Sequence, residues 1–240
     1  MTPTPVFTPA RARTIEMLAA AAHLVVAVAL LTLSLGGTSI VLPVELSLPA
    51  GGPGAFAGVD LAAASAVVLL GSAAARAAVA LRPAGGRAAR ALELSQVAGI
   101  TLFLIAQLNG IAEAGALVLC YAIAAVAIGV LWMQGRDPLE DRRSAWPYSL
   151  GAALAIVPWG VVALYQVVGI TVGASPAPLV RVVTIVVLVL AAALWLVERR
   201  WQLGLLTDTH AELLRTALTL ANGIALLVLA VGLARPSALM

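Results

Sequence analysis

Few ionisable side chains lie within the long apolar stretches of this sequence, and those few are the candidates for chemistry. Glu93 lies in the stretch 88–112, and Arg76 lies six residues before Arg82 in the preceding stretch. A charge inside a bilayer costs about 3 kcal/mol unless it is paired. Counted from the turn at 84–86, both side chains lie roughly 9 Å along antiparallel helices, which predicts an Arg76–Glu93 ion pair. The alternative is that Arg76 extends to the lipid headgroups and Glu93 is protonated.

Three other polar or helix-breaking positions lie near the middle of apolar stretches. His23 is the only histidine in its stretch, Pro158–Trp159 interrupts another, and Asn222–Gly223 forms a small polar break in the last. We expect Pro158 to free a backbone carbonyl and Trp159 to fill a cavity. Taken alone, His23 is more typical of a hydrogen-bonded packing residue than of a ligand, and Asn222–Gly223 is more typical of a helix-packing notch.

No pattern typical of an enzyme is present. The sequence has no nucleophile elbow, P-loop or dinucleotide fingerprint. With two histidines and one cysteine, Cys120, a Cys/His metal site is not expected. We therefore predict a protein that is not an enzyme, with no catalytic residues and no metal site.

The composition identifies an integral membrane protein. The 240 residues are 62% hydrophobic and 10% charged, with a mean hydropathy of +1.06, whereas soluble domains are typically about one quarter charged. All 14 basic residues are arginine, and the chain contains no lysine. A net charge of +3 in such a chain reflects membrane topology, so no nucleic-acid partner is expected.

Seven stretches are long enough to cross a bilayer, which needs about 20 apolar residues. The first, 14–35, exceeds the about 7–15 residues of a signal-peptide core, so we expect it to be retained. Lipid offers no hydrogen-bond partners to open sheet edges, so the spans must be helices. We predict a single all-α transmembrane domain over 1–240 with spans near 14–36, 59–82, 88–112, 114–135, 147–169, 177–198 and 211–233.

The arginines predict the orientation of the chain. They gather before the first span and between spans 2 and 3, 4 and 5, and 6 and 7, as Arg11, Arg13, Arg82, Arg87, Arg90, Arg136, Arg142, Arg143, Arg199, Arg200 and Arg215. Only Arg181 and Arg235 lie near the opposite ends. By the positive-inside rule we expect a multi-pass protein of the cell membrane with a cytoplasmic N-terminus and an external C-terminus.

Two connecting segments differ from the other short loops. In the external segment 36–59, residues 39–48 alternate between β-branched and other apolar types and are bounded by Pro and Gly, which is consistent with a small β-hairpin. An irregular Gly/Pro loop is the alternative. The segment 135–145 mixes both charges and is predicted to be a solvated turn.

Four segments resemble the heliorhodopsins, seven-helix rhodopsins whose N-terminus faces the cytoplasm. These are RARTIEMLAAAAHLVVAVALLTLS with the central His23, VLPVELSLP, RALELSQVAGITLFLIAQLNGI with Glu93, and GAALAIVPWGVVALY with Pro158 and Trp159. The resemblance implies that Glu93 matches the counterion of the retinal Schiff base. It also implies that the external loop forms a β-hairpin that contributes to a homodimer.

The sequence departs from the family where retinal attaches. Heliorhodopsins carry a lysine in span 7, but here LTLANGIALL places Gly223 at that position, or Asn222 after a one-residue slip. Arg76 also stands where the family usually has a cavity histidine. We expect no Schiff base and no covalent cofactor, and we hypothesise that the Arg76–Glu93 pair replaces the Schiff-base ion pair.

Three functions remain compatible with these residues. The first is a non-pumping regulatory or sensory protein that acts through unknown protein partners. The second is a non-covalent binder of retinal, a carotenoid or a lipid, in a pocket formed by His23, Glu93, Pro158, Trp159, Asn222 and Gly223. The third, a small transporter or channel, is disfavoured because the spans show no inverted repeat.

Overall fold

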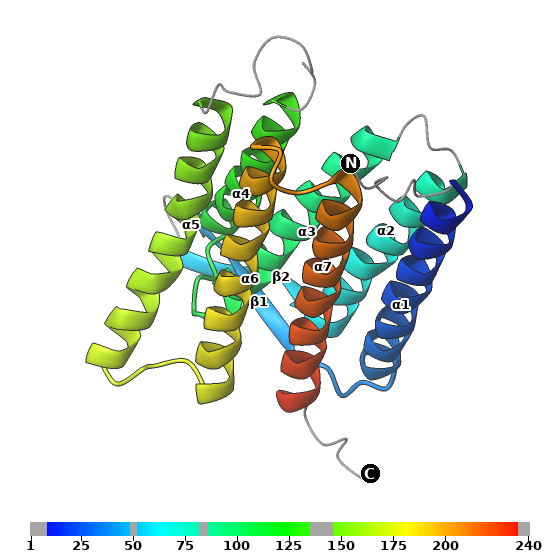
Figure 1. The fold of residues 1–240 in the computed structure, drawn as a ribbon. Coiled ribbons are helices and arrows are strands. Elements are labelled where there is room, and N and C mark those ends of the chain that lie inside the picture. The colour runs from blue at the N-terminus through cyan, green and yellow to red at the C-terminus, as the bar shows by residue number, and fades with distance from the viewer. Residues whose placement is uncertain (1–8, 49–51, 82–85, 135–145, 235–240) are drawn as a thin grey trace.

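Membrane-length helices dominate the computed structural model, which describes residues 9–48, 52–81, 86–134 and 146–234. Within these ranges, seven helices are long and apolar enough to cross a bilayer (Figure 1). They are α1 (Pro9–Leu35), α2 (Leu61–Leu81), α3 (Gly86–Leu108), α4 (Ala114–Gln134), α5 (Trp146–Thr171), α6 (Pro178–Gln202) and α7 (Asp208–Gly232). The predicted rhodopsin-like seven-helix bundle is confirmed.

The helices alternate in direction, so the bundle has two distinct ends (Figure 1). The starts of α1, α3, α5 and α7 lie at one end, which we call the N-terminal end. The loop between α1 and α2 and the end of α7 lie at the other, which we call the hairpin end. The predicted solvated turn at 135–145 lies outside the described residues, as do the side chains of Arg11, Arg82, Arg87, Arg136, Arg142, Arg143 and Arg235.

The loop between α1 and α2 forms the predicted β-hairpin, and the alternative of an irregular loop is wrong. Strand β1 (Val41–Leu48) pairs antiparallel with β2 (Gly52–Asp60). The register shifts between Val44 and Glu45, as at a β-bulge that turns the strand. Two strands alone are marginally stable in water, so this hairpin needs contacts with the bundle.

Those contacts are made by β1 at the turn between α3 and α4. The backbone N–H of Glu45 donates to the Ala112 carbonyl at 2.8 Å, and Gln107 Nε2 donates to the Pro43 carbonyl at 3.1 Å. Leu42 is buried in the same apolar cluster as the helices. The hairpin is therefore fixed to the bundle by both hydrogen bonds and packing.

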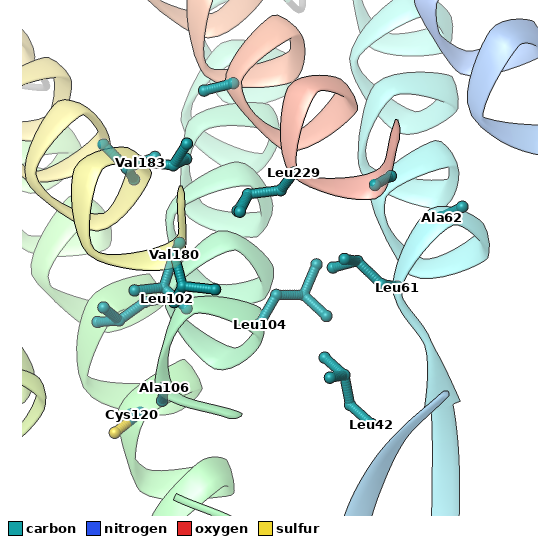
Figure 2. Close-up of a cluster of buried hydrophobic side chains, with 14 of the residues drawn as sticks. Leu42, Leu61, Ala62, Leu102, Leu104, Ala106, Cys120, Val180, Val183 and Leu229 are labelled. Carbon is teal, nitrogen blue, oxygen red and sulfur yellow. The ribbon is translucent and has the colours of Figure 1, made fainter. Parts of the chain in front are cut away.

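The main apolar cluster joins the hairpin to the middle of the bundle. Figure 2 shows Leu104 of α3 with Leu42 of β1, Leu61 of α2 and Leu229 of α7 around it. Lipid tails are as apolar as leucine, so these contacts stabilise the fold through close van der Waals packing. This cluster holds α2, α3 and α7 together below the charged residues at the N-terminal end.

Candidate functional site

A buried ion pair joins α2 to α3 near the N-terminal end. Arg76 Nε lies 3.0 Å from Glu93 Oε1, and both side chains are fully buried. Arg76 also donates through Nη2 to Thr219 Oγ1 at 3.2 Å and through Nη1 to Thr216 Oγ1, both on α7. The sequence predicted that Arg76 and Glu93 lie at the same depth and form a pair, and the structure brings them together. Glu93 does not face lipid, because its side chain is fully buried.

Glu93 has a second cationic partner on its own helix. Arg90 Nη1 lies 2.7 Å from Glu93 Oε2, one helical turn away. Arg90 also contacts Glu16 of α1, and its Nε lies 2.7 Å from Oε1 of Glu212 of α7. Arg76 approaches the same two carboxylates at 3.7 and 3.8 Å. Two guanidinium groups therefore share three carboxylates from three helices.

A bidentate ion pair extends this network to α6. Arg215 Nε and Nη2 lie 2.6 and 2.9 Å from the two carboxylate oxygens of Glu198. Its Nη1 lies 3.5 Å from Glu212, and its guanidinium lies 5.0 Å from the centre of the Trp201 ring. Bidentate pairs of this kind are among the stronger hydrogen-bonded contacts in proteins. They tie the start of α7 to the end of α6.

We call these seven side chains the charge network: Glu16, Arg76, Arg90, Glu93, Glu198, Glu212 and Arg215. With three guanidinium groups and four carboxylates, its formal charge is −1. It connects α1, α2, α3, α6 and α7. Buried charges are tolerated when they are paired and hydrogen-bonded. Here every member has a partner of opposite charge, and hydrogen bonds join Arg90 to Glu93 and Arg215 to Glu198.

His23 lies at the inner edge of the charge network. It is fully buried, and Nδ1 donates to the Ala19 carbonyl at 2.8 Å, since a carbonyl can only accept. Nε2 lies 3.3 Å from Thr219 Oγ1, the hydroxyl that also accepts from Arg76. His23 is therefore connected to Arg76 through Thr219.

A small cavity lies between α3, α4, α5, α6 and α7, and Trp159 and Asn222 are among its lining residues. Its volume is about 80 Å³, and Thr101 and Thr219 also line it. Asn222 Nδ2 donates to Thr101 Oγ1 at 2.8 Å. Sites for drug-sized ligands usually span about 300–1,000 Å³, so this cavity is small for a polyene of twenty carbons.

Gly223 faces a different neighbour. A Cβ atom at Gly223 would lie 2.5 Å from Cδ2 of Leu69 on α2, and Pro158 is buried within α5. The cavity walls include Trp159 and Asn222 but neither of these residues. The six predicted pocket residues therefore do not all line this cavity: Glu93 belongs to the charge network and His23 lies at its edge. Thr219 contacts Arg76 and His23 and also lines the cavity.

The sequence did not indicate that two arginines and three glutamates, Glu16, Glu198 and Glu212, belong to the site. Arg90 and Arg215 served only as markers of the cytoplasmic side, but Arg90 is 9% exposed and the Arg215 side chain is 13% exposed. The reason is that both helices extend past their apolar runs and neighbouring helices cover their ends. The signal that was available is spacing, since Arg90 and Glu93, and Glu212 and Arg215, are three residues apart on one helix face.

Seven membrane-length helices, a hairpin against the bundle and a carboxylate held deep between helices define a rhodopsin-like membrane protein. The sequence model of the family described as Heliorhodopsin matches residues 12–202, so the chain belongs to the heliorhodopsin family. This family comprises photoreceptor-type membrane proteins rather than typical enzymes. The match covers nearly all of α1 and the whole of α2–α6 and ends before α7, the helix with Asn222 and Gly223. No curated protein matches the chain.

Proposed function

We propose that this protein is a heliorhodopsin that forms no retinal Schiff base and acts as a non-pumping regulatory or sensory membrane protein. The observation that carries the proposal is the Arg76–Glu93 contact of 3.0 Å between two fully buried side chains, in a chain without lysine. A Schiff base needs a primary side-chain amine, and arginine does not supply one.

Arg76 accounts for the charge that the missing lysine leaves unbalanced. In a retinal-bound heliorhodopsin the protonated Schiff base is the cation beside the residue equivalent to Glu93. Here a guanidinium, which stays charged at any physiological pH, contacts the same carboxylate. Removing one partner of a buried pair costs about 3–5 kcal/mol, so a permanent cation at this position keeps the bundle stable without a chromophore.

The packing of α7 also favours a protein without covalent retinal. Leu69 fills the space beside Gly223, and the cavity beside Asn222 is about 80 Å³. Retinal, a carotenoid or a lipid tail at that site requires the helices to move apart. For this reason we rank non-covalent binding of such a molecule second, after the regulatory or sensory role.

The distribution of acids argues against ion pumping. Between Glu93 and the acids at the hairpin end, Glu45, Asp60 and Glu113, the spans carry no carboxylate. Proton relays through membranes commonly use chains of Asp, Glu or His. We therefore propose that the protein acts through protein partners, as a homodimer in the cell membrane, with its N-terminal end cytoplasmic and its C-terminus external.

Reconstitution with all-trans retinal tests this proposal. The purified full chain is incubated with retinal, its visible spectrum is recorded before and after hydroxylamine, and parallel samples are reduced with borohydride for mass spectrometry. We expect no red-shifted band and no covalent adduct, whereas a red-shifted band that hydroxylamine bleaches, or a borohydride-reduced adduct, would overturn the proposal. A co-eluting band without a red shift and without an adduct after borohydride would support non-covalent binding instead. Mass spectrometry of natively extracted protein shows whether any small molecule co-purifies.

A further inference from the structure

A second, larger cavity opens at the N-terminal end of the bundle. Its volume is about 410 Å³, and α1, α2, α3, α4, α6 and α7 all contribute to its walls. This volume lies in the range of small-molecule sites, which are concave and mostly apolar with a few convergent polar groups. The cavity adjoins the small one through shared walls at Leu94, Ile128 and Leu194.

The walls of this cavity are apolar on one side and charged on the other. Leu131 of α4, Leu194 of α6 and Leu213 of α7 belong to the apolar side. The charged lining residues are Glu16, Glu198, Asp208, Glu212, Arg90 and Arg215. Four carboxylates against two guanidinium groups give the lining a formal charge of −2, so it attracts a cation rather than an anion.

Glu212 is the most exposed carboxylate of the charge network. Its side chain is 24% exposed, compared with 10% for Glu16 and Glu198. Its Oε2 lies 3.5 Å from Arg215. Its Oε1 lies 2.7 Å from Arg90 Nε and is enclosed by the protein, so it does not reach the cavity. Oε2, whose contact with Arg215 Nη1 is long, is the oxygen left to accept from a ligand.

We propose that this cavity binds a small amphipathic ammonium compound. The ammonium group lies beside Glu212 and Asp208, and the apolar body packs against Leu131, Leu194 and Leu213. The added charge offsets the excess carboxylate of the charge network. An anion is disfavoured because the guanidinium groups of Arg90 and Arg215 are already paired with carboxylates, and the excess negative charge of the lining would repel it.

This inference goes beyond the proposed function and does not depend on it. The ligand is recognised at the N-terminal end by Glu212, whereas a retinal-like molecule would occupy the small cavity lined by Trp159 and Asn222. A retinal experiment that overturns the proposed function therefore does not bear on the ammonium site. Likewise, absence of ammonium binding does not bear on the proposed function.

Three probes with one apolar body and different charges test the site. Adamantylamine is cationic at neutral pH, adamantanol is neutral, and adamantane carboxylate is anionic. Each is titrated calorimetrically into the full chain in lipid nanodiscs, with empty nanodiscs as the reference for membrane partitioning. We expect the amine to bind at least tenfold more tightly than the alcohol and the carboxylate not to bind. Equal affinities for amine and alcohol, or binding of none of the three, would overturn the proposal.

Variants locate the binding. We expect Glu212→Gln to reduce the affinity for adamantylamine at least fivefold without changing that for adamantanol. Ala91→Phe keeps every charge but fills the cavity, and should abolish binding of both compounds even if Glu212→Gln folds poorly. Glu45→Gln, at the hairpin, is the matched control and should leave the affinities unchanged. An amine affinity that both Glu212→Gln and Ala91→Phe leave intact would place the binding elsewhere and refute the assignment.

Discussion

Removing the guanidinium of Arg76 is the most informative perturbation of the charge network. Arg76→Met keeps much of the side-chain volume and leaves Glu93 with a single cation, since Arg90 Nη1 stays 2.7 Å away. Breaking a buried pair usually costs about 3–5 kcal/mol. Because one partner remains, we expect about 3 kcal/mol of lost stability, at the low end of that range.

The companion variant, Glu93→Gln, separates the pair from its surroundings. It removes the carboxylate charge but keeps a hydrogen-bonding group, so we expect a loss of about 2 kcal/mol. Once one member of a buried pair is gone, removing the other usually costs little more. The double variant Arg76→Met/Glu93→Gln should therefore lose about 3 kcal/mol, rather than the about 5 kcal/mol that the two single losses add up to. The predicted coupling energy is about 2 kcal/mol.

The assay is equilibrium unfolding of purified protein in mixed micelles by titration with SDS, followed by circular dichroism. Arg181→Met, on α6 near the hairpin end, is the control and should change stability by less than about 1 kcal/mol. If both single variants unfold like the wild type, or if the double variant shows the simple sum, the Arg76–Glu93 pair does not stabilise the bundle.

Three further predictions follow from other parts of the structure. A Cβ atom at Gly223 would lie 2.5 Å from Leu69 Cδ2, so Gly223→Val should destabilise the protein by about 1–3 kcal/mol through overpacking. Adding Leu69→Ala should restore part of that lost stability, which equilibrium unfolding of the double variant checks. Arg215→Met should cost about 3 kcal/mol by leaving Glu198 buried and unpaired, and an unchanged unfolding transition would contradict it. If the N-terminal end is cytoplasmic, Thr207→Cys should react with a membrane-impermeant maleimide only after the cells are opened. Labelling of intact cells would show the opposite orientation.

Most of the fold follows from two periodicities in the sequence. Apolar runs of bilayer length place the seven helices because lipid permits little else. In the first loop, alternation places Leu42 and Val44 in the core while Val41 stays 62% exposed, as a strand requires. Helix ends were less predictable, because α6 continues past the apolar run through Arg199 and Arg200 to Gln202.

The site was only partly predictable, because the sequence gives the depth of a residue in the membrane but not the direction in which its side chain points from the helix. Counting residues from the turn placed Arg76 and Glu93 at one level, and the structure brings them to 3.0 Å. Counting does not say which way a side chain points. Successive residues on a helix differ by about 100°, so Asn222 lines the small cavity while its neighbour Gly223 faces Leu69.

The charge network was missed because charges near helix ends are usually solvated or extend to the headgroups. Burial of Glu16, Arg90 and Glu212 depends on which helices are neighbours at the N-terminal end, and α1 packs against both α2 and α7. Single-sequence patterns do not contain that information. Opposite charges three residues apart on one helix were the only local sign.

The charge state of Glu93 tests the replacement of the Schiff-base cation most directly. Infrared spectra of the wild type and Glu93→Gln, recorded without retinal in lipid, differ only by the absorption of this one side chain and its close neighbours. Pairing with Arg76 predicts that the substitution removes a carboxylate band and no protonated carboxyl band. Loss of a protonated carboxyl C=O band instead would show that Glu93 is neutral, and that Arg76 does not take the place of the missing cation.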